Sequence, residues 1–139
     1  MKFAIYDTLP KESMNIRNTV FVEEQGFIDE FDDIDKISSH ILLFDGNSAI
    51  ATCRVFSGDA PGEYHIGRLA VIREYRGRGL GRKIIEEAER HILSLGGESA
   101  SLHSQLQAKS FYEKCGYEPY GEIEYEQDCP HIGMRKKLK

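Results

Sequence analysis

Apolar residues follow two spacings along the chain, one typical of strands and one typical of helices. Short apolar or alternating runs predict strands over residues 3–6, 64–71, 100–103, 121–125 and 131–137, and a hairpin that pairs residues 40–44 with 49–56. Apolar side chains at helical spacing predict helices over residues 11–22, 82–95 and 105–115. This order of elements indicates an α+β fold with a mixed, mostly antiparallel sheet.

A glycine-rich segment separates the strand that ends at residue 71 from the helix that follows. Residues 76–81 read Arg-Gly-Arg-Gly-Leu-Gly. Glycine adopts backbone angles that let successive N–H groups point into one concave loop, and such a loop at a helix N-terminus binds anions. The two arginines add positive charge. The segment therefore predicts a ligand that carries a pyrophosphate.

Two common nucleotide-binding patterns do not fit this loop. The dinucleotide fingerprint requires a third glycine at position 82, where the chain has Arg82. The Walker A pattern requires Gly-Lys followed by Ser or Thr, whereas Arg82, Lys83 and Ile84 follow the last glycine. The spacing therefore disfavours a nucleotide-binding domain.

The composition narrows the class of protein and of partner. The 139 residues, 40% of them hydrophobic and 29% charged, are typical of one globular domain spanning 1–139. No apolar run could span a membrane and the first residues lack a signal core, so we expect a cytoplasmic protein with no membrane partner. The net charge of −5 disfavours nucleic acid and favours cationic partners such as amines. Cys53, Cys115 and Cys129 lack metal-ligand spacing, and we predict no metal.

Two motifs together resemble the signatures of the GNAT superfamily of acyl-CoA-dependent N-acetyltransferases. Residues 76–81 match its pyrophosphate loop, Arg-x-x-Gly-x-Gly. The second signature, Asn-x-x-Ala-x-x-Φ-Tyr followed by Gly-aromatic, resembles the run Gln105, Ala108, Phe111, Tyr112, Gly116 and Tyr117. Gln105 replaces the usual Asn and carries its amide on a side chain one methylene longer. Residues 20–25 and 130–134 are similar to the small bacterial ElaA-like members.

The resemblance implies a single-domain GNAT fold, whose central sheet is flanked by helices and whose strand before the pyrophosphate loop splays. It implies acetyl-CoA as the cosubstrate. By resemblance, the backbone of Leu69, Ala70 and Val71 binds pantetheine and aims one N–H at the thioester oxygen, a contact worth roughly 2.7–4 kcal/mol in acyl-transfer enzymes. The other residues that would bind the cosubstrate are Arg76, Gly77, Arg78, Gly79, Leu80, Gly81, Arg82, Gln105 and Tyr112.

Acyl transfer to an amine also needs an acid and a base. The resemblance places Tyr112 near the CoA sulfur, and a phenol stays protonated at pH 7 and can donate to a leaving thiolate. The base that deprotonates the amine is left open among two carboxylates and two imidazoles. These candidates are Glu23, Glu24, His103 and His131.

Residues 23–35 form an acidic stretch with seven carboxylates and no Lys or Arg. We expect a solvated, mobile face there, with an amine-recognition rim as the alternative. Arg68 lies in an otherwise apolar strand, and we expect it either to pair with an acidic group of this stretch and shape the acceptor site, or to reach the sheet edge.

The sequence thus predicts an N-acetyltransferase that moves an acetyl group from acetyl-CoA to a primary amine, by direct attack in a ternary complex. The acceptor, a small molecule or a peptide, is not specified. The alternative is a non-catalytic acyl-CoA-binding sensor or structural module, and Tyr112 favours catalysis over it. The oligomeric state is also left open, with a homodimer among the options.

Overall fold

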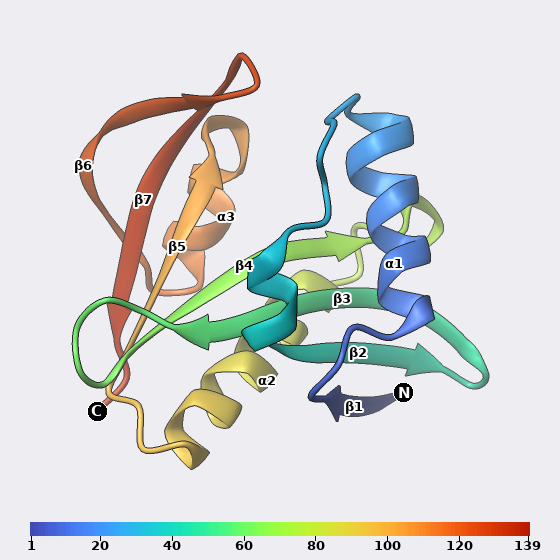
Figure 1. The fold of residues 1–139 in the computed structure, drawn as a ribbon, viewed down its shortest axis with the longest axis horizontal. Helices are drawn as coiled ribbons and strands as arrows, with labels where there is room; N and C mark the ends of the chain where they lie inside the picture. Colours follow the sequence, from blue (N-terminus) through green and yellow to red (C-terminus); the bar gives the residue numbers. More distant parts are fainter.

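The structure, a computed structural model, describes residues 1–139 and is built around one seven-stranded sheet (Figure 1). The strand order is β1-β2-β3-β4-β5-β7-β6, and every neighbouring pair is antiparallel except β4 and β5. The strands are β1 (Lys2–Tyr6), β2 (Ser39–Asp45), β3 (Ser48–Ser57), β4 (Glu63–Val71), β5 (Ser99–Gln105), β6 (Glu118–Glu126) and β7 (Cys129–Lys137). The predicted α+β class and the mostly antiparallel sheet are confirmed.

The sheet opens between its two central strands. The parallel pairing of β4 with β5 covers three residue pairs and ends at His65 and Ser101. Beyond that point β4 continues beside β3 and β5 continues beside β7, so the two arrows diverge in Figure 1. The β5-facing edge of β4 therefore has no strand partner from Ile66 to Val71. This is the splay that the family resemblance implied.

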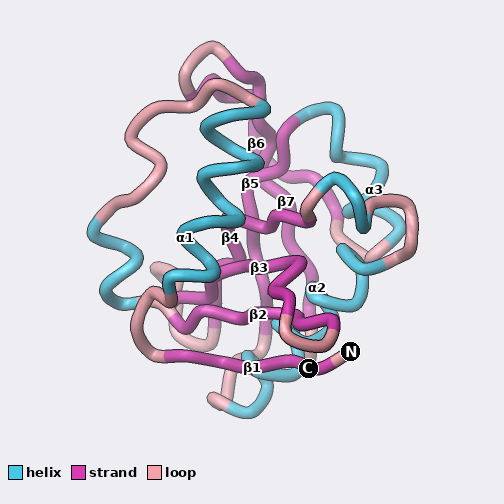
Figure 2. The backbone as a smooth tube through the Cα atoms, turned by 90° about the vertical axis from the view of Figure 1, so that its right-hand side faces the viewer, coloured by secondary structure: helices cyan, strands magenta, loops and turns pink.

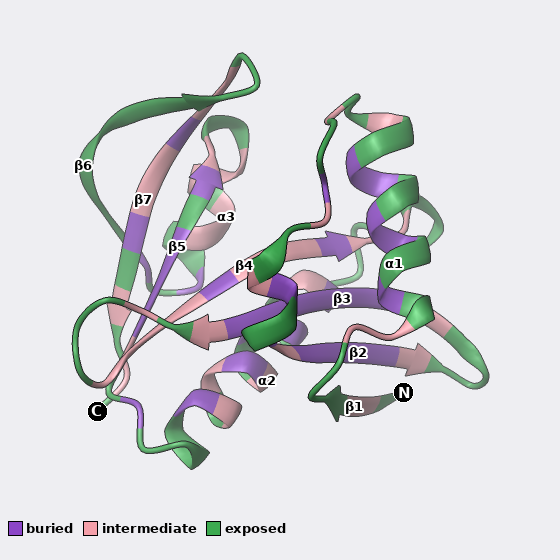
Figure 3. Ribbon diagram, viewed as in Figure 1, coloured by how far each residue is buried: buried purple, intermediate pink, exposed green.

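Two helices cover opposite faces of the sheet. Alternate residues of β2 point to opposite sides, and Leu42 packs with Ile16 of α1 (Lys11–Arg17) whereas Ile41 packs with Ile84 of α2 (Leu80–Ser94). Figure 2 shows β1, β2 and β3 side by side in that order. In Figure 3, β3 is buried along most of its length, and the edge strand β6 is exposed throughout. No helix combines the length and apolar character that a membrane crossing needs.

Two predicted helices differ from the observed ones. The helix expected over residues 11–22 is α-helical only to Arg17 and continues as a π-helix over Asn18–Glu24. Its spacing was right, since Ile16, Val20 and Phe21 all face the sheet, but apolar spacing does not distinguish the two hydrogen-bond patterns. The helix expected over 105–115 is shorter, because β5 extends to Gln105 and pairs there with His131. A 3-10 turn, Leu106–Ala108, then leads into α3 (Lys109–Lys114).

Candidate active site

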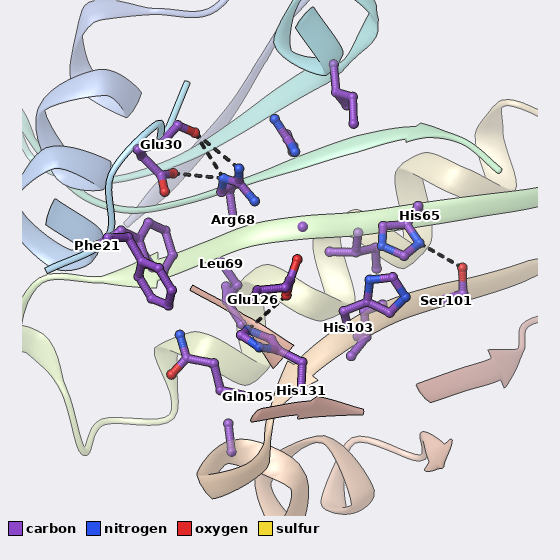
Figure 4. A pocket seen from close by; sticks show the side chains of 18 of the residues that line it. Phe21, Glu30, His65, Arg68, Leu69, Ser101, His103, Gln105, Glu126 and His131 are labelled. Carbon is purple, nitrogen blue, oxygen red and sulfur yellow. Dashed lines mark hydrogen bonds and ion pairs between the residues drawn. The ribbon is translucent and has the colours of Figure 1, made fainter. Parts of the chain in front are cut away.

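A cavity of about 810 Å³ lies where the sheet opens, between the segment that follows α1 and the free edge of β4. Figure 4 shows side chains from both sides of the splay that point into it. Its walls include most of the predicted site residues that lie on strands or on α3, as well as two from the glycine loop. They are Leu69, Ala70, Val71, Arg76, Gly81, His103, Gln105, Tyr112 and His131.

The glycine loop forms one end of this cavity. Gly77 and Gly79 have φ of +78° and +73°, a conformation that glycine adopts without strain. The six successive backbone N–H groups from Gly77 to Arg82 make no hydrogen bond within the chain. The last three of these groups also form the N-terminus of α2, which carries a positive partial charge. The loop has the donors and the field of an anion site.

Two of the three arginine side chains around the loop are held in place. Arg76 donates from Nε to the Val71 carbonyl at 2.8 Å and pairs with Glu24 at 2.8 Å. Arg78 lies over the ring of Tyr75, 4.8 Å from its centroid. Arg82 is exposed and forms no ion pair. A Cβ at Gly81 would lie 3.1 Å from the ring of Phe111, so glycine there also permits α3 to approach the loop.

The strand next to the loop carries an irregularity that faces the cavity. The register between β3 and β4 shifts between Thr52 and Arg54, a β-bulge, and Arg68 opposite it has φ of +52°. A positive φ is uncommon for a residue with a side chain and has to be held by its surroundings. Arg68 Nε lies 2.8 Å from the Glu30 carboxylate, and its guanidinium also donates to the Glu30 carbonyl (Figure 4). The predicted pairing of Arg68 with the acidic stretch is confirmed.

The expectation of a solvated, mobile acidic face is wrong for three carboxylates in the second half of residues 23–35. Glu30 and Asp35 are 7% and 5% exposed. Asp35 binds Arg17 at 2.7 Å and Arg54 at 2.9 Å, and Glu30 binds Arg17 at 3.0 Å. Asp32 binds Arg54 at 2.7 Å. Three arginines from α1, β3 and β4 thus neutralise three carboxylates, which sequence could not reveal because the partners lie far apart along the chain.

Burial and ion pairing act in opposite directions on these carboxylates. At Asp35, burial alone would raise the pKa, but hydrogen bonds and charge from Arg17, then Arg54, outweigh it and lower the pKa to about 2. At Glu30, burial outweighs the neighbouring arginines, so its pKa is raised. We call Arg17, Arg54, Arg68, Glu30, Asp32 and Asp35 the charged clamp, because it fastens the segment after α1 to the sheet.

Tyr112 lies between the two ends of the cavity, on α3. Its ring meets Phe111 and Tyr117 edge to face, with centroids 4.9 and 6.2 Å away. Its hydroxyl has no hydrogen-bond partner in the chain. Arg54 Nε is the only fully buried side-chain nitrogen or oxygen without a partner, so the Tyr112 hydroxyl is not fully buried. The hydroxyl therefore keeps some contact with solvent, and Tyr112 is one of the residues that line the cavity. Burial of the ring, with Cys53 and Cys115 nearby, raises the pKa of Tyr112, so the phenol is protonated at pH 7.

The four candidate bases occupy different environments. Glu23 is exposed and does not line the cavity, and Glu24 is held by Arg76 and Arg73. His131 is 9% exposed and uses both ring nitrogens, Nδ1 with the Cys129 carbonyl and Nε2 with Glu126, at 2.9 and 3.1 Å.

The fourth candidate, His103, is exposed and has no hydrogen-bond partner. It lies beside a histidine that the sequence reasoning missed, His65 of β4, with ring centroids 5.1 Å apart (Figure 4). One feature of the sequence could have pointed to His65 as a site residue, namely its position on the strand that leads into the glycine loop.

Two side-chain bridges cross the cavity. The Gln105 amide donates to Gln25 Oε1 at 2.7 Å and accepts from Gln107 at 2.6 Å. Gln127, in the turn between β6 and β7, accepts from the Ile28 N–H and donates to the Ile28 carbonyl, at 2.8 and 2.6 Å. These bridges join the segment after α1 to the far side of the splay.

Comparison with known proteins agrees with this geometry. The family model of the acetyltransferase (GNAT) domain matches residues 12–138. A Bacillus subtilis (strain 168) protein named as an acetyltransferase is 37% identical over 130 residues, which cover 90% of this chain and 87% of its own length.

Solved structures have the same fold. Escherichia coli ElaA superimposes with a TM-score of 0.85 at 26% identity, covering 97% of this chain and 98% of its own. An aminoglycoside 6'-N-acetyltransferase solved with coenzyme A has a TM-score of 0.79 at 15% identity, covering 100% of this chain and 98% of its own, which shows the fold alone. With a matched family model, a close relative and the splayed sheet beside a glycine loop, the chain belongs to the GNAT family of acetyltransferases.

Proposed function

We propose that this protein transfers an acetyl group from acetyl-CoA to the nitrogen of a primary amine, by direct attack within a ternary complex. The observation that carries the proposal is the continuity of the cavity. The loop with six partnerless N–H groups, the free edge of β4 and Tyr112 all contribute to the walls of this one cavity. This arrangement suits a long ligand with phosphates at one end and a reactive thioester at the other.

Each part of the cosubstrate has a complementary part of the chain. The pyrophosphate lies on the loop N–H groups, next to the N-terminus of α2 and the arginines. The pantetheine arm adds to the free edge of β4 as an extra strand would. The bulge leaves Arg68 and Leu69 without a paired residue in β3, which supports a role for a backbone N–H there as the donor to the thioester oxygen.

The chemical step forms one bond and breaks one. The free amine attacks the carbonyl carbon to form the C–N bond, and the C–S bond then breaks. Tyr112 gives its hydroxyl proton to the departing sulfur and recovers a proton from the nitrogen that now carries the acetyl group. A second proton, from the acceptor ammonium, must leave before the attack.

The end of the cavity away from the loop suits a cationic acceptor. The arginines there are already neutralised within the charged clamp. Four further carboxylates line the cavity and have no Lys or Arg partner: Asp29, Asp59, Glu63 and Glu126. An alkylammonium, on a small molecule or on a peptide, complements this charge.

Two measurements test the proposal. Calorimetry with acetyl-CoA, ATP and NAD should give binding for acetyl-CoA alone. A screen of primary amines, including ethylamine, benzylamine, spermidine and a lysine peptide, should release free thiol from acetyl-CoA and give N-acetylated product by mass spectrometry. Binding of acetyl-CoA with no product from any amine would instead support a non-catalytic acyl-CoA-binding module, and no acetyl-CoA binding would refute both.

A further inference from the structure

His65 stands at the point where the two central strands separate. It belongs to the last residue pair between β4 and β5, opposite Ser101. Its neighbour Ile66 is buried in the core on the α2 side, so the His65 side chain lies on the opposite face, which is the face of the cavity. Figure 4 shows its ring directed toward Ser101 and beside that of His103.

One nitrogen of this imidazole is occupied and the other is free. Nδ1 lies 3.0 Å from the hydroxyl oxygen of Ser101, a residue that is only 4% exposed. Nε2 of His65 has no hydrogen-bond partner in the chain. Arg54 Nε is the only fully buried side-chain nitrogen or oxygen without a partner, so His65 Nε2 is not fully buried. Because His65 lines the cavity, its Nε2 is reachable from there. None of the other candidate bases has this combination. Glu24 and His131 are engaged by protein partners, Glu23 does not line the cavity, and His103 has no hydrogen-bond partner that positions its ring.

We propose that His65 Nε2 accepts, through cavity water, the proton that the acceptor ammonium loses, while Ser101 positions the ring and His103 passes the proton to solvent. Leu69 lies four positions after His65, about 13 Å along an extended strand, so the path includes water. Ser101 Oγ accepts from Nδ1–H both before and after the transfer, and Nε2 becomes an N–H. The inference rests on the proposed acetyl transfer.

The surroundings keep His65 uncharged between turnovers. The groups that face it are Arg54 from β3, Asp59 from the loop before β4, His103 from β5 and the ring of Phe56. Burial, then His103 and Arg54, lower the pKa of His65 to about 4, with Asp59 opposing them. The imidazole is thus neutral at pH 7. An imidazolium there is unstable, so the proton moves on to the exposed His103.

The first test needs no acceptor. The imidazole ¹⁵N spectrum of the coenzyme A complex at pH 7 should show His65 neutral with hydrogen on Nδ1 and none on Nε2. An Nε2–H tautomer, or an imidazolium, would overturn the proposal. This measurement decides about His65 even if no amine is acetylated, in which case the proposed acetyl transfer fails separately.

The second test is kinetic and uses any amine that the screen identifies. His65→Gln should lower kcat about 100-fold at pH 7, the low end of general-base effects. The deficit should shrink as pH rises toward the pKa of the amine, since a free amine needs no base, and it should also shrink with hydroxylamine, which is largely uncharged at pH 7.

The matched control is His91→Gln. His91 is likewise half-buried and lies 3.0 Å from a serine hydroxyl, that of Ser39, but it sits on α2 outside the cavity. It should keep the kcat of the unchanged protein. A His65→Gln deficit that is the same at every pH and for both amines would mean that His65 only supports packing.

Discussion

At the loop end of the cavity six backbone N–H groups have no partner within the chain. At the other end, which we call the acceptor end, the three arginines and three carboxylates of the adjoining charged clamp already bind one another. The first end is incomplete without an anion. The charged clamp is complete without any ligand, and its charges hold the segment after α1 against the sheet.

The difference separates ligand affinity from stability. Solvated donors in an exposed loop contribute to binding when phosphates replace water, and they contribute little to the fold. Buried, paired charges contribute to the stability of the fold and not to ligand binding, because removing one partner leaves another charge buried without compensation. Changes at the two ends should therefore move different measured quantities, and changes between them should move the reaction rate.

The largest effect is expected between the two ends. Tyr112→Phe deletes only the hydroxyl that faces the cavity, so acetyl-CoA should still bind while kcat falls by about 10²–10⁴-fold. Tyr117→Phe is the control, because the Tyr117 ring contacts that of Tyr112 but its hydroxyl bonds Glu89 instead. Steady-state kinetics of both variants check this. A kcat for Tyr112→Phe equal to that of Tyr117→Phe would make Tyr112 a packing residue.

At the acceptor end we expect a large loss of stability. Arg17 is 1% exposed, and Arg17→Met would leave Glu30 and Asp35 short of a partner, at a cost of about 3–5 kcal/mol in the free energy of unfolding. Arg76→Met removes a half-exposed ion pair at the loop end and should cost at most about 1 kcal/mol. Urea unfolding of both variants measures the contrast. Equal losses would mean that the clamp is no more important to the fold than a surface pair.

The clamp should also weaken in acid. The pKa of Asp35 is about 2 in the folded protein against a reference of 3.8, so its contribution is complete above pH 4 and is lost as pH falls toward 2. A shift of this size corresponds to about 2 kcal/mol. The unfolding free energies of the unchanged protein and of Asp35→Asn are measured at several pH values between 4 and 2. They should converge as pH falls. A difference that stays constant with pH would contradict the ionised state of Asp35.

The loop end could be predicted from sequence because its chemistry is local. Gly77 and Gly79 lie two residues apart, and their spacing alone specifies both the positive φ values and the exposed N–H groups. The splay of β4 came from the family resemblance, and the apolar periods placed most strands within a few residues.

The acceptor end could not be predicted in the same way. Arg17, Asp35 and Arg54 come from three separate elements, and nothing in the spacing of an acidic run tells which carboxylates will meet buried arginines. His65 was missed for a related reason. Its free nitrogen, its serine partner and its neutral state all depend on β5, which joins β4 only after the whole of α2.

The smallest effect is expected from the replacement of a single glycine, which tests the glycine loop by itself. Gly79→Val places a side chain at φ of +73° in open space, where no heavy atom lies within 4 Å. The loop can relax at little cost to the fold, but its N–H groups then turn away from a common centre. We therefore expect the Kd for coenzyme A to rise about tenfold, the equivalent of 1–2 kcal/mol of left-handed strain.

The matched control is Gly46→Val, since Gly46 has φ of +60° and equally open space in the turn between β2 and β3. Thermal unfolding without ligand should change alike in the two variants, and calorimetry with coenzyme A should separate them. If both variants bind coenzyme A as the unchanged protein does, the partnerless N–H groups are not the pyrophosphate site, and the contrast between the two ends of the cavity loses its basis.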